Sequence, residues 1–181
     1  MSDDSQLPPE EIVWEGKWIT ARRRGKWEYA SRARQIRAAV ILAIENDEVL
    51  LVEQFRVPLN QRCLELPAGL IGDDDGGKDD DPLSAAKREL EEETGYVAAH
   101  WQECGEFFSS PGMVSESFTL LKATGLTKVS DGGGTDSEDI IVHRVKLSQI
   151  EQFIADFRKD GVGMDTRMLL LLGPQLLRST D

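Results

Sequence analysis

The 181-residue chain contains few cysteines, and this scarcity bounds its class. The two that occur, Cys63 and Cys104, provide no disulfide framework, and their spacing matches no metal-binding motif. No apolar run approaches the roughly 20 residues of a membrane-spanning helix, and the stretch MSDDSQLPPEEI lacks the apolar core of a secretory signal. We therefore expect both cysteines to be packed thiols in a cytoplasmic protein without a membrane partner.

Positive charge is also scarce. The sequence has 21 Lys and Arg residues against 33 Asp and Glu, which gives a net charge of −12 at pH 7. This balance argues against a nucleic-acid partner, because such proteins need a basic surface. An anionic small molecule remains compatible, since a bound divalent cation can invert the local charge. With 40% hydrophobic residues, the chain can bury the core of one domain, with or without an appendage.

The N-terminal region reads as an appendage. We predict a loosely held arm over residues 1–11, followed by strand-like runs at 12–21 and 26–34 that the segment RRRG joins as a hairpin. Because an isolated hairpin is only marginally stable, it should dock on its own domain or on a partner chain. We expect the arm and hairpin to occupy residues 1–36 and the main domain residues 37–181.

The main region alternates strand and helix signals without regular βαβ units, which predicts an α+β fold. Its clearest helix has a capping residue, Asp81, a proline at its first position and Gly95 as its stop signal. Predicted strands cover 37–44, 49–56, 62–66, 97–108, 116–123 and 139–146, and predicted helices cover 82–94, 148–159 and 164–178.

An aspartate-rich segment, GDDDGGKDDD, precedes this helix at residues 72–81. Its composition predicts a loop. Oxygen-rich Asp/Gly runs also suit calcium, but the spacing of an EF-hand and its closing glutamate are missing. A solvated loop and a calcium-binding loop are the two interpretations.

The stretch RELEEETGY, residues 88–96, crowds glutamates into the last turns of the predicted helix. At about 100° per residue, Glu89, Glu92 and Glu93 fall within one arc of about 100° beside the apolar stripe, whereas Glu91 points away. Like charges at this spacing repel, and the helix dipole disfavours acids at this end. An acidic surface helix is one interpretation. A divalent cation such as Mg²⁺ or Mn²⁺, which prefers carboxylate oxygens, is the other.

The same stretch resembles the second half of the Nudix box, Arg-Glu-apolar-any-Glu-Glu-any-Gly-apolar, at every position. The first half departs from the pattern. Ten residues instead of five separate Gly69 from the next acid of the motif, and that acid is Asp80 where the family has Glu. The excess residues belong to the aspartate-rich segment.

Further segments resemble the ADP-ribose pyrophosphatase branch of this superfamily. They are VEQFRVP and ELPAGLI before the box, SSPGMVSE after it, SEDIIVHRV at 137–145 and KWEYASR at 26–32. Pro111 lies sixteen residues after Gly95, the spacing that marks this branch. The resemblance implies a Nudix-type α/β/α sandwich with a mixed sheet, and hydrolysis of ADP-ribose to AMP and ribose 5-phosphate.

The resemblance also implies roles for residues of the box. Glu89 and Glu93 would hold Mg²⁺, with Mn²⁺ as the alternative ion, Glu92 assisting and the Ala68 carbonyl completing the shell. Arg88 would orient the glutamates, although a surface ion pair is the alternative. The base should come from outside the helix, with Glu138 as the first choice and Asp136 as the second. Ordinary polar turn residues are the alternative at both positions.

The substrate contacts that the resemblance implies lie outside the box. Arg56 would pair with phosphate oxygens, because a guanidinium binds them bidentately. Glu116 would bind ribose hydroxyls or the metal. The N-terminal hairpin would reach the adenine by stacking and polar contacts, and its exchange between chains would make a homodimer. The hairpin residues are Trp18, Trp27, Glu28 and Arg32.

Three other functions compete with this hypothesis. Another nucleoside diphosphate sugar, such as GDP-mannose, would need the same metal site. A catalytically silent nucleotide-sensing Nudix module would follow if Asp80 and the insertion disable the box. An acidic calcium-binding interaction protein would use the aspartate-rich segment, but would leave the tryptophan-bearing hairpin unexplained.

Overall fold

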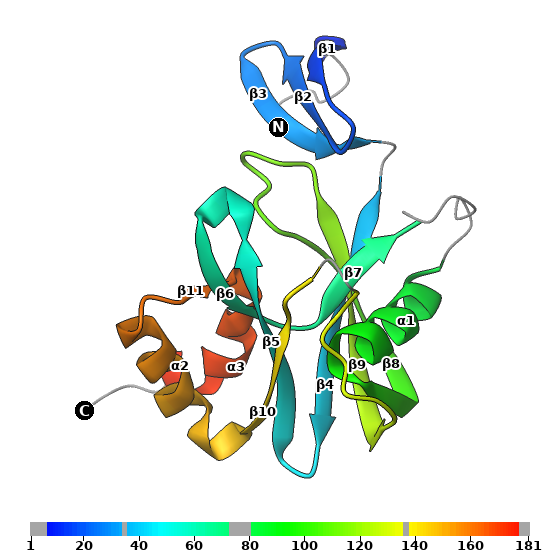
Figure 1. The fold of residues 1–181 in the computed structure, drawn as a ribbon. Coiled ribbons are helices and arrows are strands. Elements are labelled where there is room, and N and C mark those ends of the chain that lie inside the picture. Colours follow the sequence, from blue (N-terminus) through cyan, green and yellow to red (C-terminus); the bar gives the residue numbers. More distant parts are fainter. Residues whose placement is uncertain (1–6, 34–35, 73–80, 136–137, 178–181) are drawn as a thin grey trace.

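The structure is a computed structural model that describes residues 7–33, 36–72, 81–135 and 138–177. It consists of a main α+β body and a small N-terminal sheet that stands at one end of this body (Figure 1). The α+β prediction is therefore confirmed. None of the helices in the described ranges is long and apolar enough to cross a membrane.

The body is built on an eight-stranded mixed sheet with the path β11-β6-β5-β4-β9-β8, in which β10 pairs with β5 and β7 pairs with β4. Two of its pairings, β4 with β9 and β11 with β6, are parallel. The strands are β4 (Arg37–Glu45), β5 (Glu48–Arg56), β6 (Gln61–Glu65), β7 (Ala68–Ile71), β8 (Tyr96–Phe108), β9 (Ser117–Lys128), β10 (Ile141–Lys146) and β11 (Gly163–Met164).

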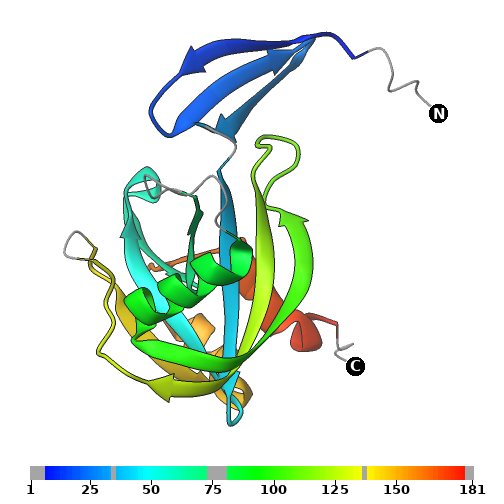
Figure 2. The same cartoon turned by 90° about the vertical axis from the view of Figure 1, so that its right-hand side faces the viewer.

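Helices cover both faces of this sheet (Figures 1 and 2). They are α1 (Pro82–Thr94), α2 (Ile150–Lys159) and α3 (Leu169–Leu176), with short 3₁₀ turns η3 (Val57–Leu59), η4 (Leu147–Gln149) and η5 (Thr166–Met168). Successive side chains of a strand point to opposite faces. Ile41 of β4 therefore packs toward α1, while Val40 belongs to the core under α2 and α3. The continuous apolar run of β4 serves both cores.

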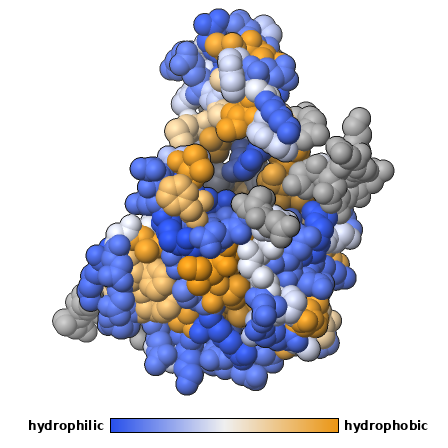
Figure 3. Space-filling model, in the orientation of Figure 1, coloured by the Kyte–Doolittle hydropathy of each residue, from blue (hydrophilic) through white to orange (hydrophobic). Residues whose placement is uncertain are grey.

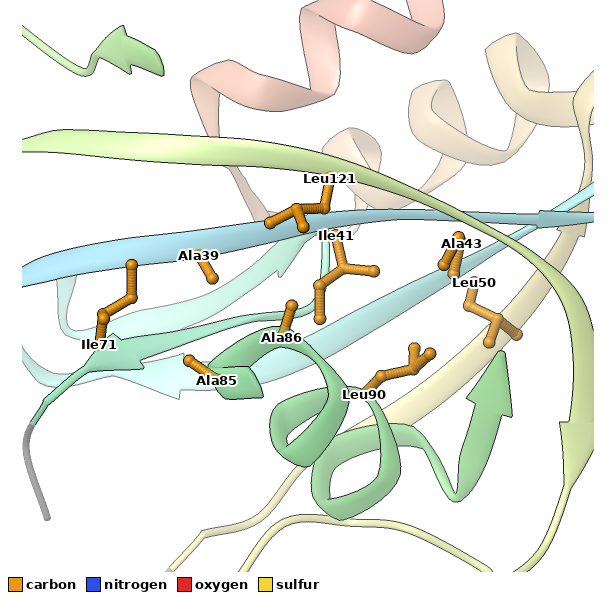
Figure 4. Packing of buried hydrophobic residues seen from close by; sticks show 10 residues of the cluster. Ala39, Ile41, Ala43, Leu50, Ile71, Ala85, Ala86, Leu90 and Leu121 are labelled. Carbon is orange, nitrogen blue, oxygen red and sulfur yellow. The ribbon is translucent and has the colours of Figure 1, made fainter. Parts of the chain in front are cut away.

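Helix α1 forms as the sequence predicts. Asp81 caps it, because its side chain accepts hydrogen bonds from the backbone N–H of Leu83 and Ser84 at 2.9 and 3.1 Å. Gly95 ends it in the left-handed conformation, with a φ of 75°. Figure 4 shows Ala86 and Leu90 of α1 turned toward Ile41 and Ala43 of β4. This packing fixes which face of the helix looks away from the core.

The N-terminal sheet differs from the predicted hairpin. It has three antiparallel strands, β1 (Glu10–Glu15), β2 (Ile19–Arg24) and β3 (Trp27–Arg32), so the predicted arm is also too long by two residues. The run predicted as one strand over 12–21 is broken by a turn, in which the Gly16 N–H bonds to the Ile19 carbonyl at 2.8 Å. Figure 3 shows hydrophobic residues at the surface of this small sheet. The large side chains exposed there include Ile12, Trp14 and Trp27.

Two further predictions need correction. The helix predicted over 164–178 begins only at Leu169, because Met164 belongs to β11 and the Asp165 side chain caps a 3₁₀ turn by accepting from the Arg167 N–H at 2.8 Å. Cys63 is buried as expected, and burial raises the pKa of its thiol to about 12. Cys104, however, is exposed at an irregularity of β8 between Glu103 and Gly105.

Candidate active site

A polar cavity of about 390 Å³ opens where β7 and the exposed flank of α1 meet β5, β9 and the turn before α3. It brings together most of the residues that the sequence singled out. From that set its lining includes Arg32, Arg56, Ala68, Glu89, Glu93, Glu116 and Glu138. Residues far apart in the sequence thus form one site.

Glu93 is the most deeply held carboxylate of this cavity. Its residue is only 5% exposed, and its Oε2 accepts a hydrogen bond from the backbone N–H of Ala68 at 2.9 Å. Burial raises the pKa of Glu93 to about 8, and the neighbouring charges of Glu89 and Glu138 add to the rise. The hydrogen bond from Ala68 and the charge of Arg56 oppose it only in part. A cation at this point would stabilise the charged form.

Glu89 lies one helical turn before Glu93 and lines the same cavity. A Cβ added at Gly69 would lie 1.9 Å from Cδ of Glu89, so only glycine permits this close approach. Nη2 of Arg88 lies 3.5 Å from Oε1 of Glu89 and donates to the Leu70 carbonyl at 3.4 Å. These contacts agree with the orienting role proposed for Arg88.

Glu92 lies apart from the other two glutamates. It is exposed and lines a separate shallow hollow with Arg88, Glu91 and the loop that follows β9. The structure therefore does not gather the predicted trio in one cavity. Within the described ranges, no three or more His, Cys, Asp or Glu side chains converge as a ready-made metal site.

Arg56 reaches the same cavity from the last position of β5. Its Nε and Nη2 bind the two carboxylate oxygens of the buried Glu65 at 2.6 and 2.7 Å. This fork geometry fixes the guanidinium plane and leaves Nη1 without a protein partner among the described residues. Arg56 is therefore a pre-oriented cation at the cavity wall.

A third arginine of the cavity, Arg167, is not predicted from the sequence, nor are its neighbours Asp165 and Thr166, which also line the cavity. Arg167 binds Asp165 through Nε and Nη2, both at 2.6 Å, and lies 3.6 Å from Glu65. The segment MDTRM contains a capping pattern, Asp165 two residues before the backbone N–H of Arg167 that it caps, which marks a turn here. The helix predicted over 164–178 runs through this turn instead.

The predicted substrate contacts of the N-terminal sheet separate into two groups. Nε of Arg32 binds Oε1 of Glu116 at 2.7 Å, and both residues also line a second cavity of about 890 Å³ between the small sheet and the body. Trp27 lines this second cavity. Trp18 and Glu28 line neither cavity, and Trp18 instead lies under Nζ of Lys17, 4.6 Å from the ring centre.

Glu138, the first choice for the base, lines the cavity of Glu89 and Glu93. Its Oε2 accepts hydrogen bonds from the N–H and the hydroxyl of Thr135 at 2.9 and 3.1 Å. Asp136, the second choice, lies outside the described residues, as does Asp80. Glu138 is thus the candidate base that the structure places in the site.

The arrangement agrees with a comparison to known families, in which the NUDIX domain matches residues 34–160. The chain belongs to the Nudix family. The resemblance to the Nudix family is therefore confirmed, whereas the unusual spacing between Gly69 and Asp80 stays an observation on the sequence alone.

Two relatives and one solved structure place this Nudix chain further. It is 35% identical over 123 residues to a methanol dehydrogenase activator of Bacillus methanolicus, covering 67% of this chain and 64% of that protein. It is 32% identical over 103 residues to an ADP-ribose pyrophosphatase of Bacillus subtilis strain 168, covering 57% and 53%. The crystal structure of an ADP compounds hydrolase shares its fold, with a TM-score of 0.69 and 22% identity over 94% of this chain and 93% of that chain.

Nudix proteins generally use a divalent metal, and the donor set here fits one. Glu89 and Glu93 line the cavity beside Ala68, and burial of Glu93, which raises its pKa, disfavours its charged form until a cation binds. Mg²⁺ typically takes one or two protein carboxylates and completes its shell with water and substrate phosphates. Two carboxylates therefore suffice without Glu92.

Proposed function

We propose that this chain hydrolyses the diphosphate of ADP-ribose, or of a related nucleoside diphosphate sugar, in a reaction that depends on Mg²⁺ or Mn²⁺. ADP-ribose and water would give AMP and ribose 5-phosphate. The observation that carries the proposal is the shared cavity, in which Glu89 and Glu93 face the fixed cation Arg56 and the carboxylate of Glu138. This set supplies the parts that diphosphate cleavage needs.

Glu89 and Glu93 would hold the cation, and the Ala68 carbonyl would add a neutral oxygen. A bound divalent ion neutralises the diphosphate and lowers the pKa of a bound water. Nη1 of Arg56 would donate to a phosphate oxygen, while Glu65 keeps the guanidinium plane in place. Substrate would thus be positioned from two opposite walls.

Glu138 would accept the proton of the attacking water. Its Oε2 is engaged by Thr135, which orients the carboxylate and leaves Oε1 for the water. The metal-carrying wall and the base would then flank the water from different elements, α1 and the loop before β10. That separation lets one group hold substrate while the other moves the proton.

The larger cavity would receive the nucleoside. Trp27 offers an aromatic face there, and the ion pair of Arg32 with Glu116 lies at the junction with the metal-carrying cavity. The exposed apolar side chains of the small sheet support a homodimer in a cytoplasmic protein. Light scattering of the purified chain tests the dimer, and a monomeric mass over a wide concentration range would refute it.

A substrate panel tests the proposed reaction. ADP-ribose, ADP-glucose, GDP-mannose and a diadenosine polyphosphate are incubated with Mg²⁺, and release of nucleoside monophosphate is followed. ADP-ribose should be among the best substrates, and no turnover of any member would sink the enzyme proposal. Glu93→Gln should lower the rate by orders of magnitude, whereas Glu91→Gln, on the exposed side of the same helix, should leave it unchanged.

A further inference from the structure

Arg62 on β6 ties two segments of the body together through one guanidinium. Its Nε donates to Oε1 of Glu53 at 2.5 Å, and its Nη2 donates to the Glu53 carbonyl at 3.0 Å. On the other side, Nη1 binds Oδ2 of Asp139 at 2.9 Å and Nη2 donates to the Asp139 carbonyl at 3.1 Å. A planar fork with several fixed donors is suited to such a double contact.

The anchor at the Glu53 end is firm. Glu53 is buried in the centre of β5, and its second oxygen, Oε2, lies 3.0 Å from Nε2 of His143. The His143 ring in turn packs edge-on against Phe153 and Phe157 of α2, with ring centres 5.5 and 5.1 Å away. Glu53 therefore has little freedom to move, and its hydrogen bonds with Arg62 fix the position of the guanidinium.

The far end of the contact is the residue that follows Glu138. The Glu138 N–H bonds to the Thr135 carbonyl at 2.9 Å and the Ile140 N–H to the Gly133 carbonyl at 3.4 Å, so backbone hydrogen bonds also hold both neighbours of Asp139. Strand β10 begins directly afterwards, with Ile141 paired to Glu53. Arg62 thus holds the backbone at Asp139, between the candidate base Glu138 and strand β10.

We propose that Arg62 is a positioning residue for Glu138: by holding the Asp139 backbone against Glu53, it sets where the Glu138 carboxylate stands in the cavity. The inference rests on the proposed function, in which Glu138 accepts the proton from water. A base displaced by even about 1 Å loses much of its effect, with losses of up to about a hundredfold. Arg62 itself does not line the cavity and would touch no substrate.

Hydrogen exchange tests the contact without any substrate. Arg62→Ala should speed hydrogen exchange of the Glu138 and Ile140 amides, because the backbone that carries them loses its contact with Arg62 of the sheet. The matched control is Arg144→Ala, which removes a different arginine–glutamate contact to β5, the pair of Arg144 on β10 with Glu48. Equal exchange at these amides in both variants and in the unsubstituted chain would overturn the proposal.

Kinetics with the panel's best substrate test the consequence. Arg62→Ala should lower kcat by about ten- to a hundredfold with little change in KM, and Arg62→Lys should recover only part of the loss. Arg144→Ala should retain normal kinetics. In a Glu138→Gln background, Arg62→Ala should lower kcat by less than about a further twofold. The position of this side chain no longer affects the rate once the base has been removed.

The outcomes separate the two proposals. Fully additive losses, or a rise in KM without a fall in kcat, would show that Arg62 acts as a general structural contact and would overturn its positioning role. Normal turnover by Glu138→Gln would overturn it as well, while leaving diphosphate hydrolysis in place. No turnover by the unsubstituted chain would refute the proposed function. The exchange comparison would still decide whether Arg62 holds the backbone around Asp139 in place.

Discussion

The backbone N–H of Ala68, the first residue of β7, donates a 2.9 Å hydrogen bond to Oε2 of Glu93 in the last turn of α1. This bond joins the start of β7, in the segment proline–alanine–glycine, to the glutamate cluster across 25 positions of the sequence. It also holds a largely buried carboxylate at the end of the helix where the dipole disfavours an acid. The site thus favours a bound cation, and the buried carboxylate lowers the stability of the fold when no metal is present.

This loss of stability should appear in the pH dependence of the free energy of unfolding. Because the pKa of Glu93 is raised from 4.5 to about 8, the metal-free folded chain holds a proton that the unfolded chain releases. Stability should therefore fall as pH rises from about 4.5 to 8, by an amount on the order of a few kcal/mol. Glu93→Gln should abolish this fall, since a glutamine carries no proton to lose.

Urea unfolding in the presence of a metal chelator at pH 5, 7 and 9 measures this effect. The free energy of unfolding of Glu93→Gln should exceed that of the unsubstituted chain at pH 9 and approach it at pH 5. Glu91→Gln is the control, because Glu91 is exposed on the same helix and should show the unsubstituted pH profile. Parallel profiles for all three chains would contradict the buried, protonated state of Glu93.

A substitution at Gly69 should displace Glu89. In Gly69→Ala the new methyl group would lie within about 2 Å of the Glu89 carboxyl, so the side chain must leave its place on the cavity wall. We expect metal affinity and kcat to fall together by at least about tenfold, because one of two carboxylate ligands is lost. Isothermal titration with Mn²⁺ and the substrate assay measure the two effects.

The control for this prediction is Gly173→Ala in α3. No atom lies within 4 Å of a Cβ built at Gly173, and the residue is helical. Alanine should be neutral or slightly stabilising there, because glycine inside a helix costs about 0.5–1 kcal/mol relative to alanine. Unchanged metal binding by Gly69→Ala would show that the close approach of Gly69 and Glu89 has no role in the site.

Local signals in the sequence predicted much of this fold. Helix α1 carries its own cap, proline and stop glycine, and the apolar run of β4 marks a strand buried on both faces. The break in the N-terminal sheet was not predictable in the same way. Alternating residues continue through the turn at Gly16, and only the pairing of β2 with both β1 and β3 shows that two strands are present.

The candidate site, too, was predictable where local sequence patterns determine it and not where long-range contacts do. Helical periodicity placed Glu89, Glu92 and Glu93 within one arc, but Glu92 and Glu93 lie about 100° apart on opposite sides of Glu89. Only the position of β7 decides that the side of Glu93 is the buried one. Arg167 enters the cavity because β11 pairs with β6, a contact between distant segments that local sequence patterns do not encode.

Trp27 should contribute to nucleoside binding, whereas Trp14 should not. Both indoles are 60% exposed, but only Trp27 lines the larger cavity. Stacking of a base on an aromatic side chain is worth about 1–3 kcal/mol. Trp27→Ala should therefore raise KM for the nucleotide substrate and weaken inhibition by AMP by similar factors, with kcat less affected.

Trp14→Ala is the matched control, because it removes an equally exposed indole from the same sheet. It should leave both constants unchanged in a monomeric chain. If the homodimer forms through the small sheet, dilution should expose any effect of Trp14 that arises through assembly. Equal KM values for Trp27→Ala and the unsubstituted chain at all concentrations would exclude the larger cavity as the nucleoside site.

Arg56 combines a binding role with a structural one, and two variants should separate them. Arg56→Ala removes the proposed phosphate donor and leaves the buried Glu65 with Arg167, 3.6 Å away, as its remaining ion-pair partner among the described residues. It should raise KM and destabilise the fold, because an uncompensated buried charge costs about 3–5 kcal/mol when nothing else approaches it. The nearby Arg167 should keep the measured loss of unfolding free energy below that range.

Arg56→Ala/Glu65→Gln should recover stability without recovering KM, since the buried charge is gone while the phosphate donor is still missing. Glu65→Gln alone keeps the guanidinium but removes its bidentate partner, so the donor is no longer held in one plane. It should raise KM less than Arg56→Ala does. Urea unfolding and substrate kinetics on the three variants measure both quantities. A KM that follows stability in every variant would mean that Arg56 contributes only to the fold, because a substrate donor must affect KM even where stability is restored.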